Sequence, residues 1–189
     1  MEPLTLTTGR LLLRPFAPDD ADAVHAACQD PAIQRWTSVP SPYEREHAQH
    51  WTRVVVPDDW HTGRSLDFAV VTPADGSLVG AIGIRGTGPV REVGFWTAAG
   101  HRGNGYTLEA LTALARWAFT EQGCGRLEWR AEVGNAGSRA VAEKAGFRVE
   151  GVLRAALPNK GTLRDCWVGG LLPSDLGLPG ADPYLPAGD

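Results

Sequence analysis

The sequence predicts a single α+β, or mixed α/β, domain. The length of 189 residues suits one domain. With 43% hydrophobic and 21% charged residues, the chain can fill a packed core. Stretches with the two-residue period of strands alternate with stretches of helical period. Their order is strand, helices, a run of strands, helix, strand, helix and strands, which is typical of this fold class.

The composition argues against several classes of protein. A formal net charge of −4 does not fit a generally basic nucleic-acid surface. No apolar run approaches the roughly 20 residues of a membrane helix, and the N-terminal residues lack the apolar core of a signal peptide. The three cysteines are far apart and odd in number, which fits reduced, buried thiols. We therefore expect a cytoplasmic protein without a nucleic-acid or membrane partner.

The N-terminal third is predicted to hold a strand and two helices. Residues 8–16 read as the strand. Pro18 and the two aspartates after it open a helix, because acidic residues suit the electropositive helix N-terminus. Asp30–Pro31 is expected to end this helix. The Ser-Pro-Tyr-Glu pattern of a capping box opens a second helix over 41–56, and 57–64 is expected to be irregular.

Three antiparallel strands are predicted next, over 66–72, 78–85 and 90–96. Pro, Gly and Asp between them favour turns. The clearest helix of the chain follows between Gly105 and Gly123, where apolar residues recur at helical spacing and the second glycine ends the helix.

The C-terminal part is predicted to complete the same domain. The remaining elements are a half-buried strand, a short helix and two further strands, over 127–133, 138–145, 147–154 and 163–171. Residues 173–189 contain four Pro and three Gly. We therefore expect a domain over 1–172 and a loose tail over 173–189.

One loop, residues 99–105, carries a chemical signal because glycines punctuate a strand-to-helix junction. The first N–H groups of a helix have no internal partner and, with the helix dipole, bind anions. Glycine lets phosphate oxygens approach the backbone, and Arg102 adds a cation. The loop lacks the Gly-Lys-Ser/Thr of a P-loop, and Leu108 replaces the third glycine of a dinucleotide fingerprint. A phosphate site of another kind is predicted, with a tight turn without ligand as the alternative.

Further motifs occur in a defined order along the chain. They are Arg10–Arg14 (RLLLR), Glu92–Trp96 (EVGFW), Arg102–Thr107 (RGNGYT), Asn135–Ser138 (NAGS), Glu143–Phe147, Glu150–Arg154 and Arg164–Asp165. In this combination the chain resembles the GCN5-related N-acetyltransferases, the GNAT superfamily. It looks closest to the RimJ/RimL branch, which acetylates the N-termini of ribosomal proteins. The resemblance extends from Thr8 to about Leu172.

The resemblance implies a mostly antiparallel sheet, splayed between strands that end near Trp96 and Val133, with acetyl-CoA in the gap. The implied coenzyme contacts are Phe95, Trp96, Thr97, Arg102, Gly103, Asn104, Gly105, Tyr106, Thr107, Asn135 and Ser138. Thr107 replaces the last Gly or Ala of the family motif and is expected to crowd the loop. No metal is expected, since His47 and His50 have no third ligand in sight.

The reaction that the resemblance implies is direct attack of a primary amine on the thioester. The amine must be neutral, so a base or a water chain takes its proton. We expect Glu92 to be the base and Asp165 to be the fallback; a salt-bridged strand carboxylate is the structural alternative for Glu92. Relatives place a Tyr acid where this chain has Ala142, which leaves Ser138 as the hydroxyl near the sulfur.

The acceptor pocket is expected in the N-terminal third, with Trp36, Trp60 and Glu92 as contacts. Asp58 and Asp59 would suit a cationic amine, whereas an inward-packed Trp60 is the alternative. The predicted function is an acetyl-CoA-dependent N-acetyltransferase that acts on a protein N-terminus or a small amine, and homodimers are common among relatives. The alternatives are a non-catalytic acyl-CoA-binding domain, a transferase of another acyl group such as succinyl, and a nucleotide-binding module.

Overall fold

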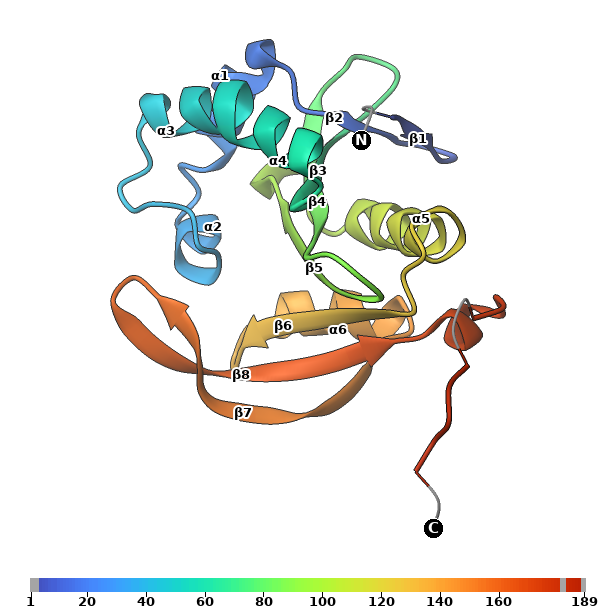
Figure 1. The fold of residues 1–189 in the computed structure, drawn as a ribbon. Coiled ribbons are helices and arrows are strands. Elements are labelled where there is room, and N and C mark those ends of the chain that lie inside the picture. Colours follow the sequence, from blue (N-terminus) through green and yellow to red (C-terminus); the bar gives the residue numbers. More distant parts are fainter. Residues whose placement is uncertain (1–3, 181–182, 188–189) are drawn as a thin grey trace.

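One sheet of eight strands organises the computed structural model, which describes residues 4–180 and 183–187 (Figure 1). The strands are β1 Leu6–Thr7, β2 Leu12–Pro15, β3 Ser65–Val71, β4 Leu78–Arg85, β5 Val90–Thr97, β6 Arg126–Glu132, β7 Arg148–Asn159 and β8 Thr162–Leu171. Their order across the sheet is β1-β2-β3-β4-β5-β6-β8-β7. Neighbours are antiparallel except β5 and β6, which run parallel. The predicted α+β class with a mostly antiparallel sheet is confirmed.

Helices pack against this sheet along its length. In the described residues they are α1 Ala21–Ala27, α2 Pro31–Trp36, α3 Arg45–His50, α4 Val56–Thr62, α5 Tyr106–Glu121 and α6 Ala136–Lys144. α4 packs on β3, α5 on β4 and β5, and α6 on β6. Figure 1 shows α1, α3 and α4 gathered together, with α2 nearer the turn between β7 and β8. Within the described part of the chain, no helix is long and apolar enough to cross a membrane.

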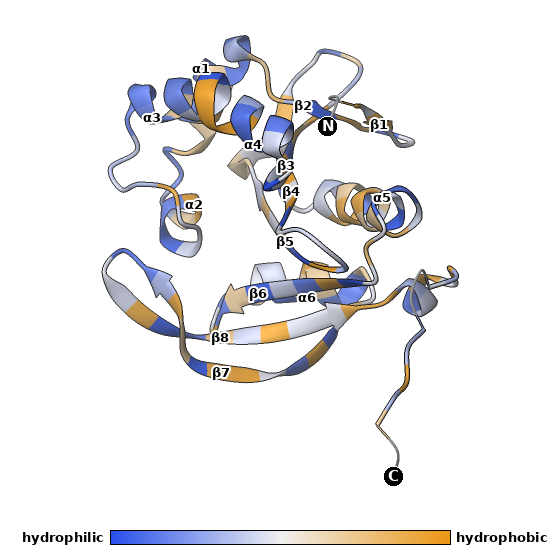
Figure 2. Ribbon diagram, viewed as in Figure 1, coloured by the Kyte–Doolittle hydropathy of each residue, from blue (hydrophilic) through white to orange (hydrophobic). Residues whose placement is uncertain are grey.

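The packing of β6 separates two chemically different faces. Alternate residues of this strand are buried, namely Leu127, Trp129 and Ala131. Leu111 and Leu114 of α5 are fully buried in the same core, and burial of one such side chain contributes about 1.5–3 kcal/mol. Because side chains alternate along a strand, Glu128, Arg130 and Glu132 face the other side. Figure 2 shows β6 as mostly hydrophilic, whereas α5 carries hydrophobic residues.

The central elements agree with the sequence prediction. The strands expected over 66–72, 78–85 and 90–96 are β3, β4 and β5, with ends that differ by at most one residue. The long helix between Gly105 and Gly123 is α5. The alternation of apolar and polar residues and the turn residues between them specify these elements locally. Contacts with distant parts of the chain therefore shift their ends little.

The first helix ends before Asp30–Pro31, as expected, but the interpretation of these residues as a helix end alone is wrong. Asp30 and Pro31 also begin α2: the Asp30 carboxylate accepts the N–H of Ala32 at 2.7 Å, and Pro31 occupies the first turn. An Asp before a Pro fits a helix start as well as a helix end, because Pro is tolerated at the first helical position.

The expected start of the second helix is also wrong. α3 begins after Glu44, whose N–H donates to Nδ1 of His47 at 2.9 Å. The Ser41 hydroxyl donates to Gln34 instead of capping the helix. The stretch 57–64, expected to be irregular, lies mostly in α4, which a π-helical segment joins to α3.

The beginning of the predicted tail packs on the domain. Residues 173–176 form a short 3₁₀ helix in which Asp175 accepts the N–H of Leu172 at 2.9 Å. Asp175 also lies 2.8 Å from the guanidinium of Arg148, and Leu178 packs against the core. The boundary between 1–172 and 173–189 stays a prediction; residues 1–3, 181–182 and 188–189 lie outside the described residues.

Candidate functional site

The parallel pair β5 and β6 separates before either strand ends. Their last paired residues are Val93 and Trp129. β5 continues to Thr97 beside β4, and β6 continues to Glu132 beside β8. Beyond Val93, one edge of β5 therefore has no neighbouring strand, and such an edge can pair with an extended ligand. The register therefore opens the sheet between Trp96 and Val133, as predicted.

The loop before α5 has the backbone conformation of an anion site. Gly103 and Gly105 adopt φ angles of +79° and +75°, which suit glycine because other residues meet a steric clash there. Gly105 is the N-cap of α5, and its carbonyl accepts the N–H of Glu109 at 3.1 Å. The N–H groups of residues 106–108, in the first turn of α5, have no partner within the helix. They can bind an anion together with the helix dipole.

Two arginines surround this loop, and sequence analysis assigned a role to only one. Arg102 donates to the carbonyl of Thr97 at 3.2 Å and lies 2.6 Å from Asp30. Arg10 donates to the carbonyl of Asn104 at 3.1 Å, lies 4.8 Å above the Tyr106 ring and pairs with Glu109 at 2.7 Å. Arg10 belongs to the RLLLR motif, but only the sheet brings that motif to the loop. The loop therefore has two arginines at its rim, each paired with a carboxylate.

Thr107 has a defined place in the site. Its hydroxyl hydrogen-bonds to the hydroxyl of Thr97. The side chain therefore connects the first turn of α5 to the end of β5, on the same strand segment as Phe95 and Trp96, whose side chains are half-buried. The departure from the family motif thus ties the two elements together at the point where the strands separate.

Asn135 and Ser138 lie at the beginning of α6. The Asn135 side chain accepts the N–H of Ser138 at 3.2 Å and thereby caps the helix. The indole N–H of Trp129 donates to the Ser138 hydroxyl at 3.0 Å. Because a hydroxyl both accepts and donates, Ser138 keeps a proton that it can give to a nearby anion.

Glu92 lies on the opposite face from Ser138. It is in register with Glu128 on β6, and so shares the face that Trp129 does not occupy. Its carboxylate is 44% exposed and lies 3.9 Å from Arg130, which pairs more closely with Glu128 at 2.7 Å. The two predicted reactive groups therefore flank the opening of the sheet from its two faces.

An ion pair with a buried carboxylate lies at the end of β6. Arg35 of α2 donates to both carboxylate oxygens of Glu132, at 2.6 and 2.7 Å. Glu132 is only 6% exposed, and hydrogen bonding to Arg35 lowers the pKa of its carboxyl. Trp36 follows on the same helix, and a Cβ at Gly134 would lie 3.7 Å from its ring. The structure thus brings Trp36 next to the residues that follow β6.

Trp60 and the fallback base lie elsewhere. Trp60 is 2% exposed, donates its N–H to the carbonyl of Asp67 at 3.0 Å and packs edge-on against Phe68. This burial corresponds to the packing alternative and gives no support to an acceptor contact. Asp165 accepts the N–H of Ala155 at 2.8 Å, a local structural role.

The acidic residues near Trp60 are not free for a cationic amine, because Asp58 and Asp59 both pair with Arg64. Among the described residues, no group of three or more His, Cys, Asp or Glu has the arrangement of a metal site.

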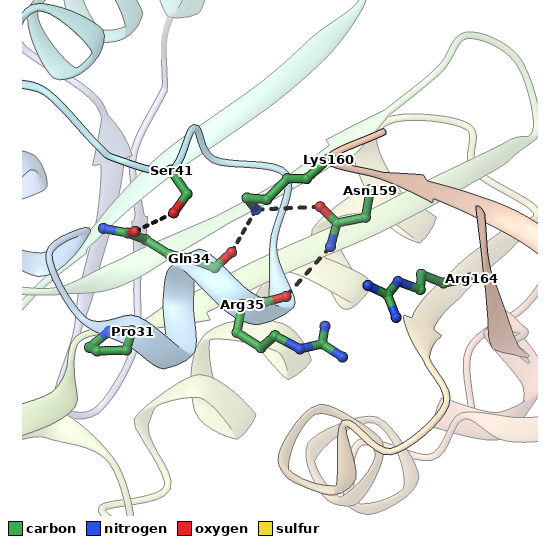
Figure 3. A pocket seen from close by; sticks show the side chains of 7 residues that line it. All are labelled: Pro31, Gln34, Arg35, Ser41, Asn159, Lys160 and Arg164. Carbon is green, nitrogen blue, oxygen red and sulfur yellow. Dashed lines mark hydrogen bonds between the residues drawn. The ribbon is translucent and has the colours of Figure 1, made fainter. Parts of the chain in front are cut away.

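A pocket of about 320 Å³ lies between α2 and the turn that joins β7 to β8 (Figure 3). Its lining residues are Pro31, Gln34, Arg35, Ser41, Asn159, Lys160 and Arg164. Sequence analysis missed it, because its two walls are more than a hundred residues apart in the chain and the one motif there, Arg164–Asp165, does not indicate a pocket.

Comparisons with known proteins give the family. The family model of the acetyltransferase (GNAT) domain matches residues 10–148. The N-acetyltransferase p20 of Bacillus licheniformis is 26% identical over 171 residues, which cover 89% of this chain and 96% of p20. RimJ of Mycobacterium smegmatis, in complex with CoA-disulfide, superposes with a TM-score of 0.79 at 25% identity, over 95% of this chain and 90% of RimJ. The ribosomal-protein-S5-alanine acetyltransferase of Vibrio fischeri gives a TM-score of 0.76 at 16% identity, over 89% and 96% of the two chains.

The matched segment contains the whole loop at α5, the separated strand β5 and the capped start of α6. The predicted N-acetyltransferase enzyme and its likeness to the RimJ/RimL branch are confirmed. The chain therefore belongs to the GNAT acetyltransferase family and resembles its RimJ/RimL branch.

Proposed function

We propose that this N-acetyltransferase transfers the acetyl group of acetyl-CoA directly to a primary amine at the opening between β5 and β6. The observation that carries the proposal is the combination of an open strand edge with the glycine-shaped start of α5. The diphosphate of the coenzyme would bind the first N–H groups of α5 and the cations Arg10 and Arg102. The amides of the pantetheine would pair with β5 between Gly94 and Thr97.

The two faces of the sheet suggest how the proton transfers are divided. The amine would approach from the face of Glu92, which takes its proton directly or through water. The amine nitrogen forms a bond to the carbonyl carbon, and the carbon–sulfur bond breaks. Ser138, near the sulfur on the other face, would stabilise the departing thiolate by donating a hydrogen bond from its hydroxyl, and the thiolate would take up the proton that left the amine, through water. A backbone N–H of the open β5 edge is the natural donor to the oxyanion.

The finer assignment concerns the acceptor. The Vibrio fischeri relative acts on the alanine of a ribosomal protein, as its name states, which supports a protein N-terminus as the acceptor here. A small amine is the other candidate. Transfer of another acyl group, cytoplasmic localisation and homodimerisation stay predictions.

Two measurements on the purified chain test the proposal. Calorimetry should detect binding of acetyl-CoA, with weaker binding of ATP. Release of free thiol should then accelerate when peptides or small amines are added. No heat with acetyl-CoA or CoA would overturn the coenzyme site. Coenzyme binding without turnover of any amine or acyl donor would instead favour a non-catalytic binding domain. This alternative is worth testing because Ala142 stands where relatives have a Tyr acid.

A further inference from the structure

The pocket between α2 and the β7–β8 turn has an excess of positive charge. Arg35 comes from α2, whereas Lys160 and Arg164 come from the β7–β8 turn and β8. Figure 3 shows the guanidinium groups of Arg35 and Arg164 pointing toward one another. None of the residues that line the pocket is acidic. Two like charges that face each other favour an anion between them.

The nearest carboxylate compensates only part of this charge. Glu132 gives both oxygens to Arg35 and lies 4.0 Å from Arg164, beyond hydrogen-bond distance. The Arg164 side chain is 44% exposed, so its N–H groups remain accessible. The local balance is thus three cations against one carboxylate.

Lys160 adds a positive charge whose hydrogen bonds go to neutral groups. Its ammonium donates to the carbonyls of Gln34 and Thr37 at 2.6 and 2.9 Å, and to the side chain of Asn159 at 3.4 Å. All three acceptors are neutral. Desolvation, together with the positive charge of Arg35, lowers the pKa of Lys160. This direction is expected where the potential is positive.

The pocket adjoins the opening of the sheet. Arg35 reaches Glu132 at the end of β6, and Trp36 lies beside Gly134. Asn135, an implied coenzyme contact, is the next residue. A small group seated in the pocket would therefore lie close to the place where the amine meets the thioester.

We propose that the acceptor carries an anionic oxygen group, a carboxylate or a phosphate, close to its reactive amine, that Arg164 binds this group, and that Lys160 and Arg35 add to the positive potential around it. The inference rests on the proposed function and names its substrate class. It replaces the expectation of acidic residues that attract the amine, since Asp58 and Asp59 are paired with Arg64. Two sources supply this chemistry: a peptide with an acidic residue near its N-terminus, or a free amino acid with an acidic side chain.

The test compares acceptors that differ only in this charge. One arm uses peptides with Asp at position 2 or 3 and the same peptides with Asn. The other arm uses the α-carboxamides of aspartate and O-phosphoserine against those of asparagine and serine, so that the controls carry no carboxylate. Binding to the CoA-saturated protein is measured by calorimetry, and turnover by thiol release. We expect at least a tenfold preference for the acidic member in one arm, which identifies the source, and a weaker preference at high salt.

Variants assign the preference to the pocket. Arg164→Gln should reduce it at least fivefold, whereas Arg164→Lys, which keeps the charge, should retain most of it. Arg116→Gln is the matched control: it removes one positive charge from α5, where Arg116 donates to the carbonyl of Leu176 at 3.5 Å, and should leave the preference unchanged. Thermal melts confirm that each variant is folded.

Equal binding of acidic and amide acceptors in both arms would overturn the inference, as would an Arg164→Gln variant with an undiminished preference. Failure of the proposed function looks different, because it removes the heat of coenzyme binding itself. The peptide calorimetry does not depend on turnover, so the inference is tested even if catalysis is slow.

Discussion

The two ends of the site are built in different ways. At the proposed coenzyme end, one continuous segment, Arg102–Thr107, presents backbone N–H groups at the start of α5. At the proposed acceptor end, side chains from α2 and from the β7–β8 turn meet across the fold. The coenzyme end depends on backbone conformation, the acceptor end on side-chain charge. Substitutions should therefore act on the two ends separately.

One contact joins the two ends. Asp30 caps α2, which carries Arg35 and Trp36, and also lies 2.6 Å from Arg102 of the coenzyme loop. This pair therefore connects the loop to α2. Substitutions at the proposed base, at each end of the site and at the Asp30–Arg102 pair test this difference between the two ends.

The largest effect is expected at Glu92, the proposed base. Glu92→Gln should lower kcat about 100-fold, because the amine loses its proton acceptor, and should flatten the acidic limb of the pH–rate profile. Coenzyme affinity, measured by calorimetry, should not change. Glu128→Gln is the matched control, since Glu128 lies in register with Glu92 and pairs with the same Arg130. Equal losses in the two variants would contradict a specific role for Glu92.

At the coenzyme end, Gly105→Ala should weaken acetyl-CoA binding about tenfold, which is about 1.4 kcal/mol. A Cβ at the N-cap hinders the approach of phosphate to the backbone, and the φ angle of +75° is strained for alanine. Gly63→Ala is the control, because Gly63 has a φ angle of +71° at the end of α4 and open space around it. Both variants should lose similar thermal stability, of about 1–2 kcal/mol. Equal affinities of the Gly105→Ala and Gly63→Ala variants for acetyl-CoA would argue against phosphate binding by the backbone at the start of α5.

The link between the ends is tested by Asp30→Asn. Asparagine preserves the helix cap but removes the negative charge beside Arg102. Coenzyme affinity should rise about two- to threefold, a small change because this arginine is 42% exposed and its ion pair is screened by water. Asp22→Asn, which breaks the exposed pair with Arg45, should have no effect on calorimetric affinity. A loss of affinity in Asp30→Asn would mean that the pair positions Arg102 for the coenzyme.

The smallest effect is a pH dependence of stability at the acceptor end. Arg35 lowers the pKa of Glu132 below its ordinary value of 4.5. The ion pair therefore adds stability above pH 4.5, and this stability is lost as the pH falls through the lowered pKa. Glu132→Gln should melt at a lower temperature than the wild type at pH 7, and the difference should shrink below pH 4.5.

An exposed carboxylate provides the control for this pH dependence. Glu143→Gln breaks the pair with Arg139 on the surface of α6, where the carboxylate is 47% exposed, and should change the melting temperature little at either pH. If the difference in melting temperature between Glu132→Gln and the wild type stayed constant from pH 7 to pH 3.5, the carboxyl group would stabilise the fold through its packing and not through its charge.

The comparison also explains which errors the sequence allowed. Strands β3, β4 and β5 and helix α5 could be predicted because alternation, apolar spacing and turn glycines act over a few residues. Asp30 and Ser41 are both good capping residues, and only packing decided that Asp30 starts a helix while Ser41 binds Gln34. Trp60 was expected to contact the acceptor because it lies beside acidic residues, yet its ring packs in the core against Phe68.

The sequence by itself determined the class of the fold and the family, and it predicted the loop proposed to bind the coenzyme, because a helix start shaped by Gly103 and Gly105 is a local property of the backbone. Only the tertiary structure decided that Arg10 joins the loop and that Arg35, Lys160 and Arg164 share one pocket. Charges on side chains act through space, so their partners are defined only when the sheet brings distant segments of the chain together.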